Sequence, residues 1–77
     1  MKYPAVYQIR VGGRVEPSML TRLGAMNITD TVSRSGEIES ILVGRLQDQA
    51  ALSGVLNTLF EMRLPVLSVE RLSSEPL

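Results

Sequence analysis

The sequence predicts a small α+β domain, and three observations support that prediction. Four short segments have the alternating or continuous apolar residues of β-strands. One segment in the second half of the chain carries its leucines and valines at helical spacing. Glycine, proline and polar turn residues separate these segments. Because the chain has 77 residues, we expect one domain over residues 1–77, with an ordered core from about residue 5 to residue 72.

The composition excludes several kinds of chemistry. The chain has no cysteine and no histidine, which excludes disulfides, thiolate-bound zinc and imidazole metal ligands. Eight basic and eight acidic side chains give a formal net charge of zero, whereas nucleic-acid-binding proteins usually carry a basic face. No stretch approaches the ~20 apolar residues of a transmembrane helix, and the first residues do not resemble a secretory signal. We therefore expect a cytoplasmic protein without cofactor, metal, nucleic-acid partner or membrane contact.

The small size of the chain favours self-association. A domain of this length has a limited hydrophobic core, and here neither disulfides nor a zinc site can supplement it. Burial of further surface against a second copy is a common source of additional stability. We therefore expect a homo-oligomer, with a dimer favoured.

The first strand and the first helix are predicted in the N-terminal third. Apolar and polar residues alternate over Tyr7–Val11, as in a strand with one buried face. The Gly12-Gly13 pair ends this strand, and Glu16-Pro17-Ser18 has the features of a helix start. Gly24 is a natural helix end, so this helix has about two turns. Its apolar stripe consists of Met19, Leu20 and Leu23.

Two further strands and a turn follow. Residues 26–33 alternate between apolar and polar, with threonines on the outer face. Asp30 falls on the apolar side of this strand, so we expect a bulge or a strand end near it. Arg34–Glu37 predicts the turn of a hairpin, and Ile38–Leu46 forms the third strand. The centre of the third strand, Ile41-Leu42-Val43, is apolar on both faces.

A second helix and a last strand complete the chain. Asp48 is the predicted N-cap of the helix, because its carboxylate can accept hydrogen bonds from the free amides of the first turn. Pro65 prevents the helix from continuing, and Val66–Leu72 is the last strand, before a frayed tail. The apolar stripe of the helix consists of Ala51, Leu52, Val55, Leu56 and Leu59.

The order strand, helix, strand, strand, helix, strand predicts the topology. With right-handed crossovers, two βαβ halves interlock into a ferredoxin-like βαββαβ sandwich. Its four-stranded antiparallel sheet has both helices on one face, the first and third strands in the centre, and the fourth strand beside the first. On this plan, Arg10 and Glu70 are expected to be neighbours on the open face.

Three blocks of the sequence resemble a group of short, uncharacterised bacterial proteins. The blocks are I-R-V-x-G-x-V-E-P at 9–17, D-Q-A-A-L-S-G-V-L at 48–56 and L-P-V-L-S-V at 64–69. They are similar to the patterns I-R-V-x-G-x-L-D-P, D-Q-A-A-L-x-G-L-L and L-P-L-L-S-V of those proteins. The resemblance implies the same two-half layout and no known activity.

Two residues depart from that resemblance. The similar proteins have glycine where this chain has Arg63, so Arg63 has to adopt a left-handed backbone unless the helix cap differs. They have a charged residue where this chain has Phe60. Phe60 is therefore expected at the edge of the buried stripe, with core packing and partner contact both open.

The loop after the first strand is the candidate ligand site. Glycines before a helix start resemble an anion cradle, although they also suit a tight exit from a strand. Such a loop also resembles the site of amino-acid-binding regulatory domains of this topology. Both alternatives use Gly12, Gly13 and Arg14 as contacts.

A hydrolase is the less favoured alternative. Val11–Val15 resembles the start of the acylphosphatase loop, in which a glycine-rich cradle ends in a phosphate-binding arginine. Here Pro17 and Met19 replace the cradle and Thr21 occupies the expected arginine position. Arg14 or Arg22 would have to serve instead. Since fold alone does not carry function, we predict no catalytic residue.

The preferred hypothesis is a non-catalytic interaction or regulatory module that self-associates. A strand that is apolar on both faces needs cover on the side without helices, and an uncovered apolar patch marks an interface. The two acidic residues Glu37 and Glu39 are interpreted as solvated charges rather than as a functional pair. The predicted interface residues are Ile41, Leu42, Val43 and Phe60.

Overall fold

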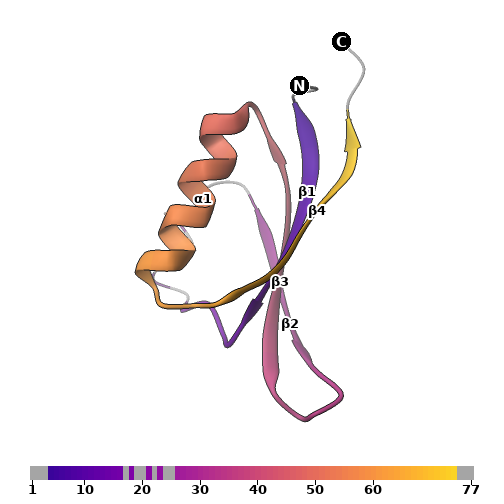
Figure 1. Ribbon diagram of the computed structural model, residues 1–77, viewed down its shortest axis with the longest axis vertical. Helices are drawn as coiled ribbons and strands as arrows, with labels where there is room; N and C mark the ends of the chain where they lie inside the picture. The colour runs from indigo at the N-terminus through magenta and orange to yellow at the C-terminus, as the bar shows by residue number, and fades with distance from the viewer. Residues whose placement is uncertain (1–3, 17, 19–20, 22, 24–25, 75–77) are drawn as a thin grey trace.

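The computed structural model describes residues 4–16, 18, 21, 23 and 26–74 of the chain. One α-helix and four strands occupy these residues, and Figure 1 shows the helix on one side of the sheet. In chain order the elements are β1 (Ala5–Gly12), β2 (Asn27–Val32), β3 (Ile38–Leu46), α1 (Gln49–Glu61) and β4 (Val66–Ser74).

The four strands form one antiparallel sheet. Their order across the sheet is β2-β3-β1-β4, and each neighbouring pair is antiparallel. This confirms the predicted α+β class, the central position of the first and third strands, and the place of the fourth strand beside the first.

The prediction of two helices is met only in part. The described residues contain one α-helix, α1. The other predicted helix, Glu16–Gly24, falls largely outside the described residues, which omit positions 17, 19, 20, 22 and 24. Within that segment Leu23 is described, and it is buried in the core. Its predicted apolar role is therefore confirmed.

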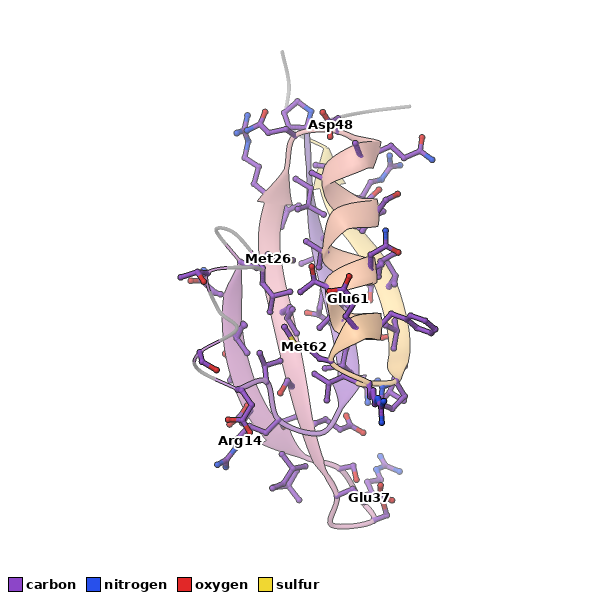
Figure 2. The ribbon with its side chains drawn as sticks, turned by 90° about the vertical axis from the view of Figure 1, so that its left-hand side faces the viewer. Arg14, Met26, Glu37, Asp48, Glu61 and Met62 are labelled. Atoms are coloured by element: carbon purple, nitrogen blue, oxygen red, sulfur yellow. The ribbon has the colours of Figure 1, made fainter. Side chains whose placement is uncertain are left out.

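The start of α1 follows the predicted capping pattern. Asp48 has an extended backbone, and its Oδ1 accepts a hydrogen bond from the Ala51 amide at 2.8 Å. Such a bond satisfies one of the free amides in the first helical turn. In Figure 2, Asp48 lies at the first end of α1 and Glu61 near its last turn.

The end of α1 is a Schellman motif built on a non-glycine residue. The Leu64 amide donates to the Leu59 carbonyl at 3.1 Å, and the Arg63 amide donates to the Phe60 carbonyl at 2.9 Å. Arg63 has a φ of 61°, as its departure from the glycine pattern predicted. A left-handed backbone costs a residue with a Cβ ~1–2 kcal/mol, and the two hydrogen bonds offset that cost.

The β2–β3 hairpin is regular throughout. Its turn is closed by the Ser33 amide, which donates to the Glu37 carbonyl at 2.8 Å, while Gly36 has a φ of 86°. The expected bulge or strand end near Asp30 was wrong, because the β2–β3 register runs without a shift from Asn27 to Val32. Figure 2 shows Glu37 at the hairpin tip, beyond the end of α1.

The core lies between α1 and the sheet. Leu42 is directly opposite Ile9 in the sheet register, and both are 0% exposed. Leu42 therefore faces the core and cannot belong to an interface, which corrects its assignment as an interface residue. The buried core cluster consists of Ile9, Val11, Val15, Leu23, Leu42, Leu46, Val55 and Leu59.

Candidate interaction surfaces

One face of the sheet has no described helix over it (Figure 1). Successive residues of a strand point to opposite faces. Because Ile9 and Leu42 point into the core, their strand neighbours point to the other face, which we call the open face. It consists of Val6, Gln8, Arg10, Asn27, Thr29, Thr31, Glu39, Ile41, Val43, Arg45, Ser68 and Glu70.

The centre of the open face is a row of four β3 residues, which we call the β3 row. It reads Glu39, Ile41, Val43, Arg45 along the strand. Ile41 and Val43 are half-buried by their neighbours in β1 and β2. The apolar residues that look outward from β3 are therefore Ile41 and Val43, with an acidic and a basic residue at the two ends.

An ion pair crosses the open face. The Arg10 Nη2 atom lies 2.7 Å from Glu39 Oε1, and the Glu39 side chain is only 12% exposed. Glu39 is thus a partly buried hydrogen-bond acceptor, not the solvated charge that we expected. Glu70, the predicted neighbour of Arg10, lies opposite Gln8 and therefore diagonal to Arg10 on the open face, as expected. The ion pair of Arg10 is with Glu39, which is diagonal to it on β3, at the usual reach of long side chains.

Most of the exposed large apolar side chains gather along β4 and at the end of α1. Phe60 is 82% exposed, and four β4 side chains are 40–49% exposed. We call these five residues the β4 surface: Phe60, Val66, Leu67, Val69 and Leu72. Of the predicted interface residues, Phe60 is thus exposed to solvent and does not pack in the core.

A shallow cavity lies beside this surface. Its volume is ≈ 610 Å³, and it is lined by Phe60, Glu61, Arg63, Leu64 and Pro65. These residues connect the last turn of α1 to the first residue of β4. The cavity combines apolar side chains with one guanidinium and one carboxylate, those of Arg63 and Glu61, features that are typical of sites for partly apolar ligands or side chains.

The two glycine amides of the predicted ligand loop are already hydrogen-bonded within the chain. The Gly12 amide donates to the Pro65 carbonyl at 2.9 Å, and the Gly13 amide donates to the Ile38 carbonyl at 2.8 Å. The Arg14 Nε atom lies 3.0 Å from Asp30 Oδ2. Both amides are therefore used within the chain, so they cannot cradle an anion. Figure 2 shows Arg14 on the β2 side of the molecule. Arg22, the alternative arginine, lies outside the described residues.

The loop is held instead by a buried serine that the sequence prediction missed. The Ser40 side chain is 0% exposed. Its hydroxyl accepts from the Val15 amide at 3.2 Å and lies 2.9 Å from the Gly13 carbonyl and 3.2 Å from Asp30 Oδ1. One hydroxyl hydrogen is shared between these two acceptors. The sequence did contain an indication of this role. Asp30 and Ser40 are polar residues on the apolar side of two adjacent strands, and they lie opposite each other.

Neither clustered metal ligands nor membrane-spanning helices are found in the part of the chain that the structure describes. Its acidic side chains do not gather in a group of three that could hold a metal ion. None of its helices has the length and apolar character that crossing a bilayer requires.

The chain matches a known family model over most of its length. A family model described as Domain of unknown function (DUF8691) matches residues 6–70, from β1 to β4. The chain belongs to the DUF8691 family. The DUF8691 match includes the whole β3 row and Arg63, and its description names no activity. No curated protein and no solved structure matches the chain.

Proposed function

We propose that this DUF8691 chain is a non-catalytic interaction or regulatory module that self-associates as a dimer through its open face. The β3 row supports this proposal, because its two apolar residues have no described element over them. In a soluble domain, apolar side chains at the centre of an uncovered sheet face favour contact with another protein surface.

The charges of the β3 row favour a second copy as the partner. When two open faces meet with their β3 strands antiparallel, Ile41 of one copy lies opposite Val43 of the other. The same arrangement brings each Glu39 toward Arg45 of the second copy. The row is therefore self-complementary, as a two-fold dimer requires. Arg45 also interacts within its own chain, and a guanidinium has five donors, enough for both contacts.

The mode of packing is one that sheets commonly adopt. Two sheets pack face to face ≈ 10 Å apart, with their strands about 30° from alignment. At that angle the central pairs stay in contact, while side chains at the corners of the sheet diverge. The contact therefore depends most on Ile41 and Val43.

An Ile41→Glu substitution tests the proposal. Burying a new carboxylate in the contact is costly, so the wild-type chain should sediment as a dimer and the variant as a monomer at the same high-micromolar concentration. Val32→Glu is the matched control, because Val32 is 66% exposed and lies outside the open face; it should remain dimeric. A monomeric wild-type chain would end the proposal.

We propose further that the full topology is the ferredoxin-like βαββαβ sandwich, and that the similar small bacterial proteins share it. The strand order β2-β3-β1-β4 and the burial of Leu23 support this. Secondary chemical shifts of residues 16–24 that lack a helical character would contradict it. A cytoplasmic location belongs to the same proposal, supported by a composition without cysteine.

Small-molecule sensing at the first loop is the weaker alternative, because the Gly12 and Gly13 amides are already bonded within the chain. The second cavity, beside Arg14, has a volume of ≈ 120 Å³, less than the ~300 Å³ at the low end for ligand pockets. A thermal-shift screen of amino acids and nucleotides would revive this alternative if one of them stabilised the protein.

A further inference from the structure

The outer edge of β4 is open to pairing with another strand. β4 pairs with β1 on one side, and no described strand lies on its other side. The β1–β4 register shifts twice and leaves Leu67 and Leu72 without direct partners in β1, but it is regular from Ser68 to Arg71. Unpaired backbone groups along such an edge are a template for an added strand.

The side chains beside this edge are apolar. Val66 and Val69 lie opposite Val11 and Ile9 in the register, so they point to the α1 side of the sheet. Both are nevertheless more than a third exposed, and Phe60 projects into solvent from the last turn of α1. An added strand with apolar residues on the α1 side would bury this surface, and the cavity beside Phe60 would accept one of its side chains.

Two arginines flank the apolar run. Arg63 precedes β4 and lines the cavity, and Arg71 lies opposite Tyr7 on the α1 side. Neither guanidinium forms an ion pair with the residues that the structure describes. Of the nearby carboxylates, Glu61 also lines the cavity but already has an interaction within the chain, and Glu70 points to the open face. On the α1 side, the order along the strand is therefore basic, apolar, basic.

These charges argue against a second copy of β4 as the added strand. A two-fold pairing of edges is antiparallel, so the end of one β4 lies against the start of the other. In the register centred on Leu67, which overlaps the apolar runs of the two strands, Arg71 of one copy would approach Arg63 of the second, and like charges at facing positions are unfavourable. An acidic side chain at each end of the incoming strand would be favoured instead.

We propose that the β4 edge and Phe60 form a second binding site, for an extended segment of another protein whose apolar residues are flanked by acidic residues. This site lies at the sheet edge and on the α1 side, whereas self-association uses the open face. A dimer would therefore present two such sites, and a monomeric variant would keep one.

Titration with designed peptides tests the proposal. The probe is acetyl-ETVTVTE-amide, in which the glutamates and the valines lie on the same face of the strand and whose symmetric sequence fits a parallel or an antiparallel approach equally. Its controls are acetyl-KTVTVTK-amide, with reversed charge, and acetyl-ETSTSTE-amide, without the valines. In amide chemical-shift titrations, the probe should perturb residues 66–72. It should bind about tenfold tighter than the lysine peptide, because the glutamate peptide forms two favourable ion pairs where the lysine peptide meets two like charges. The serine peptide should not bind measurably.

Variants of the protein complete the test. The double substitution R63E/R71E should reverse the preference between the glutamate and lysine peptides, and Phe60→Ser should weaken the probe at least severalfold. Val32→Ser, which removes another exposed apolar side chain, should leave binding unchanged. The Ile41→Glu variant should still bind the probe, so failure of self-association does not affect this result.

Three outcomes would overturn the inference. One is equal or absent binding of the glutamate and lysine peptides. Another is a set of shifts centred on β2, the opposite edge of the sheet. The third is a change from dimer to monomer on Phe60→Ser substitution, which would make the β4 surface the contact between copies.

Discussion

Ser40 shows how one polar side chain sets the local structure of this protein. It is buried at the point where the loop after β1 crosses the end of the sheet, and its hydroxyl is the acceptor for the Val15 amide. Asp30, on the neighbouring strand, connects this hydroxyl to Arg14. The residues that we first considered for anion binding are thus used to hold their own loop, which is a structural role.

A Ser40→Ala substitution should lower the free energy of unfolding by about 1–3 kcal/mol, because it leaves the buried Val15 amide without its acceptor. Chemical denaturation would measure the loss. Thr58→Val is a suitable control: the Thr58 hydroxyl donates to the Gly54 carbonyl within α1, and its removal leaves no unsatisfied donor. If both variants lost the same stability, the proposed role of Ser40 would be wrong.

Arg63 is a residue at which the backbone and the side chain have different preferences. Its positive φ suits glycine, so Arg63→Gly should raise the free energy of unfolding by about 0.5–1 kcal/mol. Arg63→Ala keeps a Cβ at the same backbone conformation and should change stability much less. Thermal unfolding of the two variants would separate the contribution of the backbone conformation from that of the side chain. If Arg63→Gly lowered the stability of the protein, the Arg63 side chain would itself stabilise the fold.

At the scale of elements, local patterns predicted most of the structure. The third strand was predicted over Ile38–Leu46 and was found over those residues. The helix cap at Asp48 and the turn over Arg34–Glu37 also agree. These features depend on periodicity and on hydrogen bonds between residues a few positions apart. The expected bulge at Asp30 was wrong because Ser40 and Arg14, distant in sequence, provide partners for its carboxylate without leaving the regular register.

The orientation of the β3 residues could be predicted only in part. An uninterrupted run such as Ile41-Leu42-Val43 has no alternation, so the sequence does not say which residue faces the core. Pairing with β1 decides it, since Leu42 lies opposite the buried Ile9. The same pairing brings Glu39 to Arg10, whereas the pairing of β4 with β1 places Glu70 opposite Gln8.

At the scale of the whole molecule, the question is how two copies meet. The proposed open-face dimer joins the ends of the β3 row by opposite charges, and ion pairs of this kind affect orientation as well as affinity. The β4 surface, by contrast, has basic residues at both ends. The two surfaces therefore have different charge symmetry, which favours a second copy at one and a different partner at the other.

Charge reversal within the β3 row tests the orientation of the dimer. Arg45→Glu should weaken dimerisation about tenfold, because it places two carboxylates opposite each other at both ends of the contact. The triple substitution R10E/E39R/R45E reverses all three charges, restores the opposite-charge contacts, and should recover most of the affinity. Analytical ultracentrifugation would measure both. A triple variant as weak as the single one would exclude the antiparallel arrangement.

The sequence by itself determined the α+β class and the approximate positions of the strands and of α1. Those features arise from residue spacing, backbone preferences and short-range hydrogen bonds, which depend on residues close together in the sequence. Only the tertiary structure decided that Leu42 is core and Ile41 is surface, that the Gly12 and Gly13 amides are bonded within the chain, and that Phe60 stands beside an open strand edge. Each of these depends on which strand lies next to which and in what register, and that is fixed by contacts between residues far apart in the sequence.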